Sequence, residues 1–356
     1  HPHNRQGHFS ALSTGRQHAD ENSRETERRM QIDGLEPPSR AFLAKHQAEI
    51  AHDVKCQVAH LEAAAREASP ASTDVATVSC GMDRMAVRMA EPAGPDALVR
   101  APRTEPYERT PPDPKEYGYR MAWVGSVSSH NAAGELLHTW RFALDATAQA
   151  EQMSRRIVPQ VKQLVESNPR AKVYCIQDES PELQVLPTLL EQTLGPHRVT
   201  SLTDIHHLMG YVEDVVDAAL PEGDPWNHKE WYWAALLTDD GAIDRIWSWL
   251  LELARNVDRD DSKAVEAINA AQSYIRNRKQ KMRYASHRAE NRPIGSGETE
   301  NTVGLMQQRV KRRGQSWEIP GLSGILSLRS LVLSESWKDA WKVYSAQHRK
   351  PVKRVH

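Results

Sequence analysis

The sequence predicts an α/β fold in which a mixed β-sheet is flanked by helices and interrupted by an all-helical insertion. The first observation is the order of segments between residues 74 and 203, which reads strand, strand, strand, helix, strand, helix, strand. The second is the stretch after residue 207, where apolar residues recur at helical spacing and tryptophan is frequent. With 356 residues, the chain is long enough for two or three domains.

The formal net charge of −1 hides an uneven distribution. Residues 276–313 contain eleven Lys or Arg and three acids, whereas residues 211–266 contain fourteen acids and five Lys or Arg. A basic segment beside acidic residues suits an enzyme that acts on the phosphodiester bonds of nucleic acids, because contacts to backbone phosphates dominate nucleic-acid affinity. Solvated charged helices explain the same pattern equally well.

The three cysteines, Cys56, Cys80 and Cys175, are far apart and form no CxxC pair. They predict neither a disulfide framework nor a zinc site, so we expect a reducing cytoplasm. No apolar run is long enough to span a membrane, and no secretory segment is evident. The first residue is His1 rather than Met, as in a fragment or a processed chain.

The N-terminal part divides into two segments. Residues 1–38 are polar and poor in aromatic residues, so we expect them to be disordered or loosely attached. Residues 39–73 contain a predicted helix, because apolar residues recur at helical intervals between 39 and 69. These residues are Leu43, Ile50, Val54, Val58 and Leu61.

The first part of the sheet domain is expected over residues 74–210. A strand rich in β-branched and small residues runs over 74–83 and ends at Asp83, and a Pro-rich loop follows over 92–114. Strands 119–128 and 135–144 are joined by a hairpin turn at Asn131–Gly134. The remaining elements are a helix over 147–167, a strand over 171–178, a helix over 181–194 and a strand over 197–203.

Three segments complete the chain. Residues 211–290 form the predicted helical insertion, whose apolar stripes favour a packed core over a base-stacking platform. Residues 291–345 return to the sheet domain as C-terminal helices. Residues 346–356 form a basic tail that contains Arg349, Lys350, Lys353 and Arg354.

A glycine-broken turn leads into a helix at residues 292–300. Ser296 suits the N-cap position, and acids in the first turn suit the positive end of the helix dipole. Glu298 and Glu300 are two residues apart, so they point to nearly opposite sides of the helix and only one can face a given site. A capped surface helix with solvated charges is the plain alternative.

Several motifs in this region resemble a known family. Gly295-Ser-Gly-x-x-Glu300, then Lys311-Arg-Arg-Gly-x-x-Trp317, Ile325–Leu331 and Trp337–Trp341 are similar to the C-terminal end of bacterial insertion-sequence DDE transposases of the ISKra group, which are related to Mutator-like transposases. The resemblance, together with the element order, implies an RNase H-like fold with a helical insertion before the last catalytic helix. It also implies that Glu300 is the last of three metal-binding carboxylates.

The other two carboxylates follow from strand ends and from the same resemblance. Asp83, with the Arg84–Pro92 run after it, is similar to the family's first aspartate segment, and Asp178 occupies the second position. Carboxylate oxygens suit two Mg²⁺ ions, for which Mn²⁺ can substitute. Glu179-Ser180 departs from the family, which has Gly and a small residue there.

Further residues receive supporting roles. Asp204 and His207 resemble the family's Asp-x-x-His signature, for which we expect a supporting role; a helix N-cap with His207 packed below it is an equal alternative. Lys311, Arg312 and Arg313 are candidates for contacts to DNA phosphates.

The leading interpretation is a DDE transposase that cleaves and transfers DNA strands, bound to element ends and target DNA as a homodimer or larger assembly. We expect it in the bacterial cytoplasm, associated with the nucleoid and not with a membrane. The alternatives are a non-catalytic DNA-binding protein derived from a decayed or truncated transposase, and an RNase H-like nuclease without strand transfer.

Overall fold

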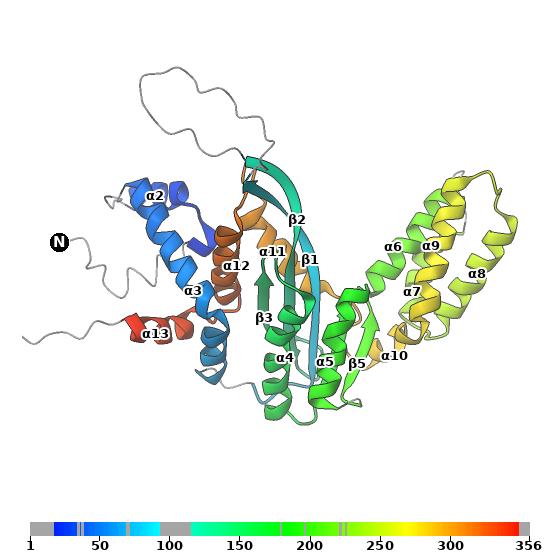
Figure 1. Ribbon diagram of the computed structural model, residues 1–356. Coiled ribbons are helices and arrows are strands. Elements are labelled where there is room, and N and C mark those ends of the chain that lie inside the picture. The colour runs from blue at the N-terminus through cyan, green and yellow to red at the C-terminus, as the bar shows by residue number, and fades with distance from the viewer. Residues whose placement is uncertain are drawn as a thin grey trace, which may run out of the picture.

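The computed structural model describes residues 18–33, 36, 39–68, 72–92, 115–178, 180–195, 197–220, 223–224 and 226–348. Its centre is a five-stranded sheet in the order β3-β2-β1-β4-β5 (Figure 1). The strands are β1 (Thr77–Pro92), β2 (Lys115–His130), β3 (Leu136–Leu144), β4 (Lys172–Gln177) and β5 (Val199–Thr203). Strands β1 to β3 form an antiparallel meander, and β4 pairs parallel with both β1 and β5. This is the RNase H-like α/β arrangement that the sequence predicted.

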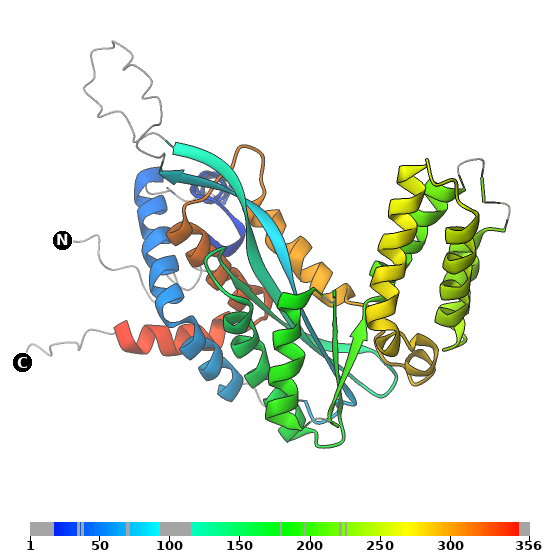
Figure 2. The same ribbon diagram turned by 45° about the vertical axis from the view of Figure 1, so that its right-hand side comes forward.

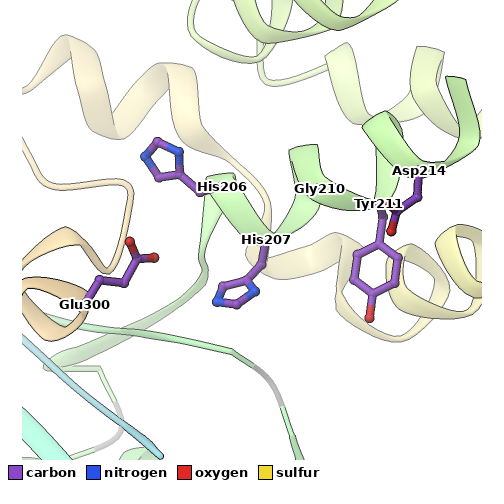
Figure 3. A pocket seen from close by; sticks show the side chains of 6 residues that line it. All are labelled: His206, His207, Gly210, Tyr211, Asp214 and Glu300. Atoms are coloured by element: carbon purple, nitrogen blue, oxygen red, sulfur yellow. The ribbon is translucent and has the colours of Figure 1, made fainter. Parts of the chain in front are cut away.

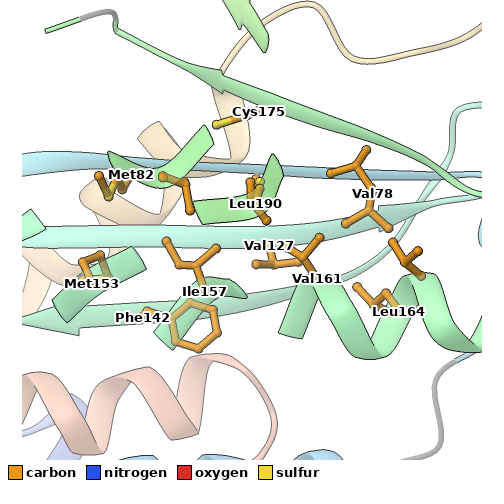
Figure 4. Packing of buried hydrophobic residues seen from close by; sticks show 14 of the residues in the cluster. Val78, Met82, Val127, Phe142, Met153, Ile157, Val161, Leu164, Cys175 and Leu190 are labelled. Atoms are coloured by element: carbon orange, nitrogen blue, oxygen red, sulfur yellow. The ribbon is translucent and has the colours of Figure 1, made fainter. Parts of the chain in front are cut away.

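One face of the sheet is covered by α4 (Ala150–Ser167) and α5 (Val185–Leu194), which follows a 3-10 turn at Pro181–Gln184. Figure 4 shows the cluster between this face and α4. Burying these apolar side chains stabilises the layer, at about 25 cal/mol per Å² removed from water. Its members include Val78, Met82, Val127, Phe142, Met153, Ile157, Val161, Leu164, Cys175 and Leu190.

The opposite face is covered by α11 (Gly297–Val310) and α12 (Ile319–Leu333). The run Leu322–Leu331 of α12 is buried throughout, because α3 (Arg40–Ala68) and α13 (Trp337–His348) pack on its outer side. The predicted N-terminal helix is therefore confirmed as α3. The predicted basic tail begins later than expected, since α13 includes residues 346–348; its four named cations lie outside the described residues.

The insertion stands to one side of the sheet in both views of the chain (Figures 1 and 2). It has its own apolar core. Its helices are α6 (Ile205–Ala219), α7 (His228–Leu236), α8 (Ala242–Asn256), α9 (Ser262–Arg278), a 3-10 turn at Lys279–Lys281 and α10 (Tyr284–Ala289). It starts before the expected boundary at 211, because α6 begins directly after β5 and contributes Ile205, Leu208 and Met209 to this core.

Two expectations about local structure were wrong. Residues 23–32 belong to the segment that we expected to be disordered or loosely attached, but they form helix α2 (Ser23–Ile32) with a capping box between Asn22 and Glu25. Residues 18–33, here called the N-terminal strap, are held by distant arginines: Arg329 donates to the carbonyl of Ala19 at 2.9 Å and to Asp20 at 2.6 Å. Such contacts between residues about 300 positions apart leave no local pattern in the sequence.

The first strand is also longer than predicted. Strand β1 continues past Asp83 to Pro92 and pairs with β2 throughout, with Pro92 opposite Lys115. It continues because Met85, Val87 and Met89 alternate on one face and pack against α11 and α12. Most of the predicted Pro-rich loop, residues 93–114, lies outside the described residues. Among the described helices, none has the length and apolar character needed to cross a membrane.

Candidate active site

Asp83 and Asp178 come from neighbouring strands. The last registered pair between β1 and β4 is Cys80 with Cys175, and both aspartates lie three residues further on. Strand side chains alternate between faces, so both aspartates belong to the face opposite the buried cysteines, which is the α11 side. Asp83 lies inside its strand and not at its end; Asp178 follows directly after β4, as predicted.

Helix α11 lies across this face of the sheet. Thr299 is buried, and its hydroxyl is 2.8 Å from the hydroxyl of Ser126 on β2. Gly81 permits this close packing, since a Cβ atom there would lie 2.9 Å from Oγ1 of Thr299 and would collide with the carbonyl oxygen of Ile176. The helix is thereby fixed over the strand that carries Asp83.

The two acids at the start of α11 diverge, as their spacing predicted. Glu298 accepts a hydrogen bond of 3.2 Å from the hydroxyl of Thr139 on β3. Glu300 is exposed on the other side and accepts a 3.2 Å hydrogen bond from the hydroxyl of Ser296. Ser296 is the N-cap residue, but its side chain bonds Glu300 and not the helix backbone. Glu300 is therefore the acid on the insertion side of the helix.

An open cleft of about 360 Å³ lies between α11 and the insertion. Figure 3 shows Glu300 facing the start of α6, with the side chains of His207 and Tyr211 extending from the same side of that helix. The lining residues are His206, His207, Gly210, Tyr211, Asp214 and Glu300. Sequence reasoning missed His206, Tyr211 and Asp214. The spacing of His207, Tyr211 and Asp214 at i, i+4 and i+7 was the available signal for a shared helix face.

Asp204 connects the insertion to α11. It is fully buried and is the N-cap residue of α6, with Oδ1 accepting from the backbone N–H of His206 at 2.5 Å and of His207 at 3.2 Å. Its other oxygen, Oδ2, accepts from the backbone N–H of Ser296. The N-cap alternative is thus observed for Asp204, but His207 is exposed to the cleft and not packed below the cap.

Burial raises the pKa of Asp83. The backbone N–H of Arg84, which donates to this carboxylate at 2.6 Å, and the nearby His207 both act to lower it, whereas the charges of Asp178 and Glu300 raise it further. Asp83 therefore lies within electrostatic reach of both other predicted acids. Such mutual repulsion among carboxylates favours a bound cation or proton.

The donor chemistry fits a hard divalent cation, since all three side chains offer oxygen. In the structure, however, the three carboxylates are too far apart to coordinate one metal ion together. No group of three His, Cys, Asp or Glu residues in the described part of the chain could hold a metal ion. The fold thus gathers Asp83, Asp178 and Glu300 on one side of the sheet without closing them around a common point. The metal site remains a prediction.

The three cations after α11 differ in their surroundings. Arg312 forms an ion pair with Glu25 of the N-terminal strap and donates to the carbonyl of Asp20 at 2.6 Å. Lys311 and Arg313 are exposed. Arg312 therefore has an internal role that the sequence did not predict, while Lys311 and Arg313 remain candidates for phosphate contacts.

No protein-family model matches the sequence, and no curated protein matches it. Two solved structures are similar at low level. The Drosophila P element transposase strand transfer complex shares 14% identity with a TM-score of 0.34, over 95% of this chain and 81% of that one. The Mos1 transposase paired-end complex with left transposon end shares 9% identity with a TM-score of 0.20, over 83% of this chain and 81% of that one.

Proposed function

We propose that this chain is a DDE-type transposase of an insertion sequence, which cleaves DNA at element ends and joins the freed 3′ end to target DNA. The observation that carries the proposal is that Asp83 on β1 and Asp178, directly after the adjacent β4, both lie three residues beyond the last paired residues of these strands, on the face of the sheet that α11 with Glu300 covers. The sequence motifs around these three acids support the same assignment.

Asp83, Asp178 and Glu300 would hold the Mg²⁺ ions. Bound there, the ions would supply Lewis-acid activation of an attacking water or 3′-hydroxyl and would stabilise the leaving oxygen. The chain's own contribution is positional. Asp204 fixes the start of α11, and with it Glu300, against the first turn of α6. Lys311 and Arg313, exposed beyond the other end of α11, would contact phosphates.

A second candidate is a DNA-binding protein derived from a transposase that has lost catalysis. Two observations favour it: the three acids are not spaced to hold a metal ion, and Glu179-Ser180 departs from the family motif beside Asp178. This candidate keeps the fold and the exposed cations but predicts no cleavage.

The test is to incubate the full chain with Mg²⁺ or Mn²⁺ and labelled DNA that carries the nucleotide sequences flanking its gene. A transposase nicks this DNA and joins it to a second duplex. Nicking without joining would indicate a nuclease, and metal-independent binding without nicking would indicate the non-catalytic candidate.

A further inference from the structure

The N-terminal strap places an acidic side chain on one of the three cations that follow α11. Both carboxylate oxygens of Glu25 accept from Nη1 of Arg312, and Nη2 of the same guanidinium donates to the carbonyl of Asp20 at 2.6 Å. The remaining nitrogen, Nε, donates to the carbonyl of Gln308 in α11 at 3.0 Å. Both outer nitrogens of Arg312 are therefore bonded to the strap.

This ion pair lies at the surface, in a run of cations. The side chain of Arg312 is 33% exposed and that of Glu25 is 44% exposed. The neighbours of Arg312 in the sequence, Lys311 and Arg313, are both exposed. Carboxylates and phosphates offer similar paired anionic oxygens to a guanidinium. Glu25 therefore occupies the place that a phosphate of the DNA backbone would take beside Lys311 and Arg313.

The other acids of the strap have different partners. Among the ion pairs described for the strap, that of Glu25 is the one that involves the cations after α11. The remaining pairs are Asp20 with Arg329 of α12, Glu21 with Arg29 of the strap itself, and Glu27 with Arg40 at the start of α3. The strap thus offers a natural comparison between acids of equal charge and different position.

Polar contacts hold much of the strap in place. Among the ten described residues of α2, Thr26 is the one that is buried, and its hydroxyl accepts from the side-chain amide of Gln47 in α3 at 3.2 Å. A segment that buries few apolar side chains opens at a low cost in free energy, and an exposed ion pair adds little to stability. A polyanion can therefore compete with α2 for Arg312.

We propose that Arg312 belongs to a phosphate-binding site that the strap closes, in which Glu25 and the DNA backbone compete for the same guanidinium. The strap is then an autoinhibitory segment. When α2 leaves, Lys311, Arg312 and Arg313 form one continuous run of cations for DNA. The inference rests on the proposed function for its ligand, DNA, but it requires neither cleavage nor a metal ion.

The test measures the affinity of wild type and Glu25→Gln for a labelled duplex of the flanking sequences at several salt concentrations. Glutamine in place of Glu25 suits the capping box with Asn22, so α2 keeps its cap while Arg312 loses its anionic partner. Glu25→Gln should bind DNA severalfold more tightly at low salt. Its slope of log affinity against log salt concentration should steepen by about 0.9, the contribution of one phosphate contact.

Two further variants separate the release of Arg312 from a change in net charge. Adding Arg312→Ala to Glu25→Gln should cancel both effects, because the released guanidinium is absent. Glu27→Gln is the matched control: it removes the same charge from the same helix, but its partner Arg40 is not in the run of cations, so the slope should stay at the wild-type value. Equal effects of Glu25→Gln and Glu27→Gln, or a gain that survives Arg312→Ala, would overturn the inference.

The same assay distinguishes this inference from the proposed function. If wild type binds and nicks DNA and Glu25→Gln binds as wild type does, the autoinhibitory role is refuted and the proposed function stands. If wild type binds DNA without nicking it and Glu25→Gln binds more tightly as described, the strap keeps its role and the proposed cleavage is refuted. Absence of DNA binding by both chains would refute both.

Discussion

The carboxylate of Asp204 joins the first turn of α6 to the backbone N–H of Ser296, 92 residues away at the start of α11. One fully buried side chain therefore caps the first helix of the insertion and fixes the helix that carries Glu300. The insertion and the third predicted carboxylate are coupled through this contact, so a change at Asp204 should affect stability and cleavage together.

Asp204→Ala removes the acceptor for three backbone N–H groups. Loss of an N-cap costs about 1–2 kcal/mol, and leaving a buried donor unpaired adds about 1–3 kcal/mol. We expect the free energy of unfolding, measured with urea, to fall by more than a cap alone explains, and DNA nicking to fall with it.

Asp261→Ala provides the comparison for Asp204. Asp261 caps α9 by accepting from the backbone N–H of Ala264 at 3.0 Å, at an exposed position away from α11. Asp261→Ala should lower the free energy of unfolding by about 1 kcal/mol and leave DNA nicking unchanged. Equal losses of nicking in the two variants would show that the Asp204 contact has no special connection to Glu300.

Asp83→Asn should stabilise the chain in the absence of divalent cations. A carboxylate whose folded-state pKa is raised contributes stability below its unfolded pKa and loses it as the pH rises through the folded value, so ionised Asp83 is unfavourable at pH 7.5. The thermal unfolding midpoint of Asp83→Asn in EDTA should therefore exceed that of wild type, and Mg²⁺ should no longer raise it.

Asp145→Asn should have the opposite effect and lower the thermal unfolding midpoint in EDTA. Burial acts to raise the pKa of Asp145, but hydrogen bonds from Ser323 and Thr147 lower it overall, so its ionised form is the stabilising one at pH 7.5. A lower midpoint for Asp83→Asn than for Asp145→Asn would contradict the electrostatic description of the site.

The N-terminal strap should loosen in mild acid. Burial, with a smaller effect of Arg309, lowers the pKa of His18 from 6.5 to about 3, so the folded chain holds this ring neutral. A histidine with a lowered pKa contributes stability that is present above about pH 6.5 and lost as the pH falls. Between pH 7 and pH 5 the loss is about 2 kcal/mol.

Hydrogen exchange of the amides of α2 measures this loosening. Protection relative to the intrinsic exchange rate should fall between pH 7 and pH 5 in wild type, and much less in His18→Gln, which has no titrating ring. An equal fall in both chains would assign the acid sensitivity to another group.

Arg313 and Arg312 should behave differently toward DNA although they are adjacent. Each phosphate contact contributes about 0.9 to the slope of log affinity against log salt concentration, so Arg313→Ala should reduce the slope by about one. Arg312 is paired with Glu25 of the N-terminal strap. Arg312→Ala should therefore lower the protection of the α2 amides against hydrogen exchange, and it should change the salt slope less than Arg313→Ala does. Fluorescence anisotropy with a duplex at several salt concentrations measures the slopes; a larger change for Arg312→Ala would reverse our assignment.

The sequence predicted what depends on local periodicity. Strand β4 ends where its apolar run ends, so Asp178 was placed correctly, and the two-residue spacing of Glu298 and Glu300 correctly predicted that they diverge. The strap was missed because arginines near the other end of the chain hold it in place, although Asn22 followed by Glu25 is a recognisable capping-box pattern.

Contacts between segments distant in the sequence account for the rest. Nothing near Asp204 indicates that it bonds Ser296, and nothing near Glu25 indicates that it pairs with Arg312. The length of β1 was misjudged for a related reason: Met85, Val87 and Met89 bury one face against α11 and α12, which come more than 200 residues later.

The measurement that tests the central claim most directly is Mg²⁺-dependent nicking of flanking-sequence DNA by Glu300→Gln and Glu298→Gln, beside a binding assay. Both substitutions keep helix propensity, and Glu298→Gln retains a side-chain oxygen that can accept from Thr139. We predict that Glu300→Gln binds DNA at least as tightly as wild type. Its nicking rate should fall by more than roughly 100-fold, the upper end of what loss of a residue that only supports a metal ligand costs. Glu298→Gln should nick at the wild-type rate. Normal nicking by Glu300→Gln, with activity abolished in Glu298→Gln, would contradict the assignment of the site.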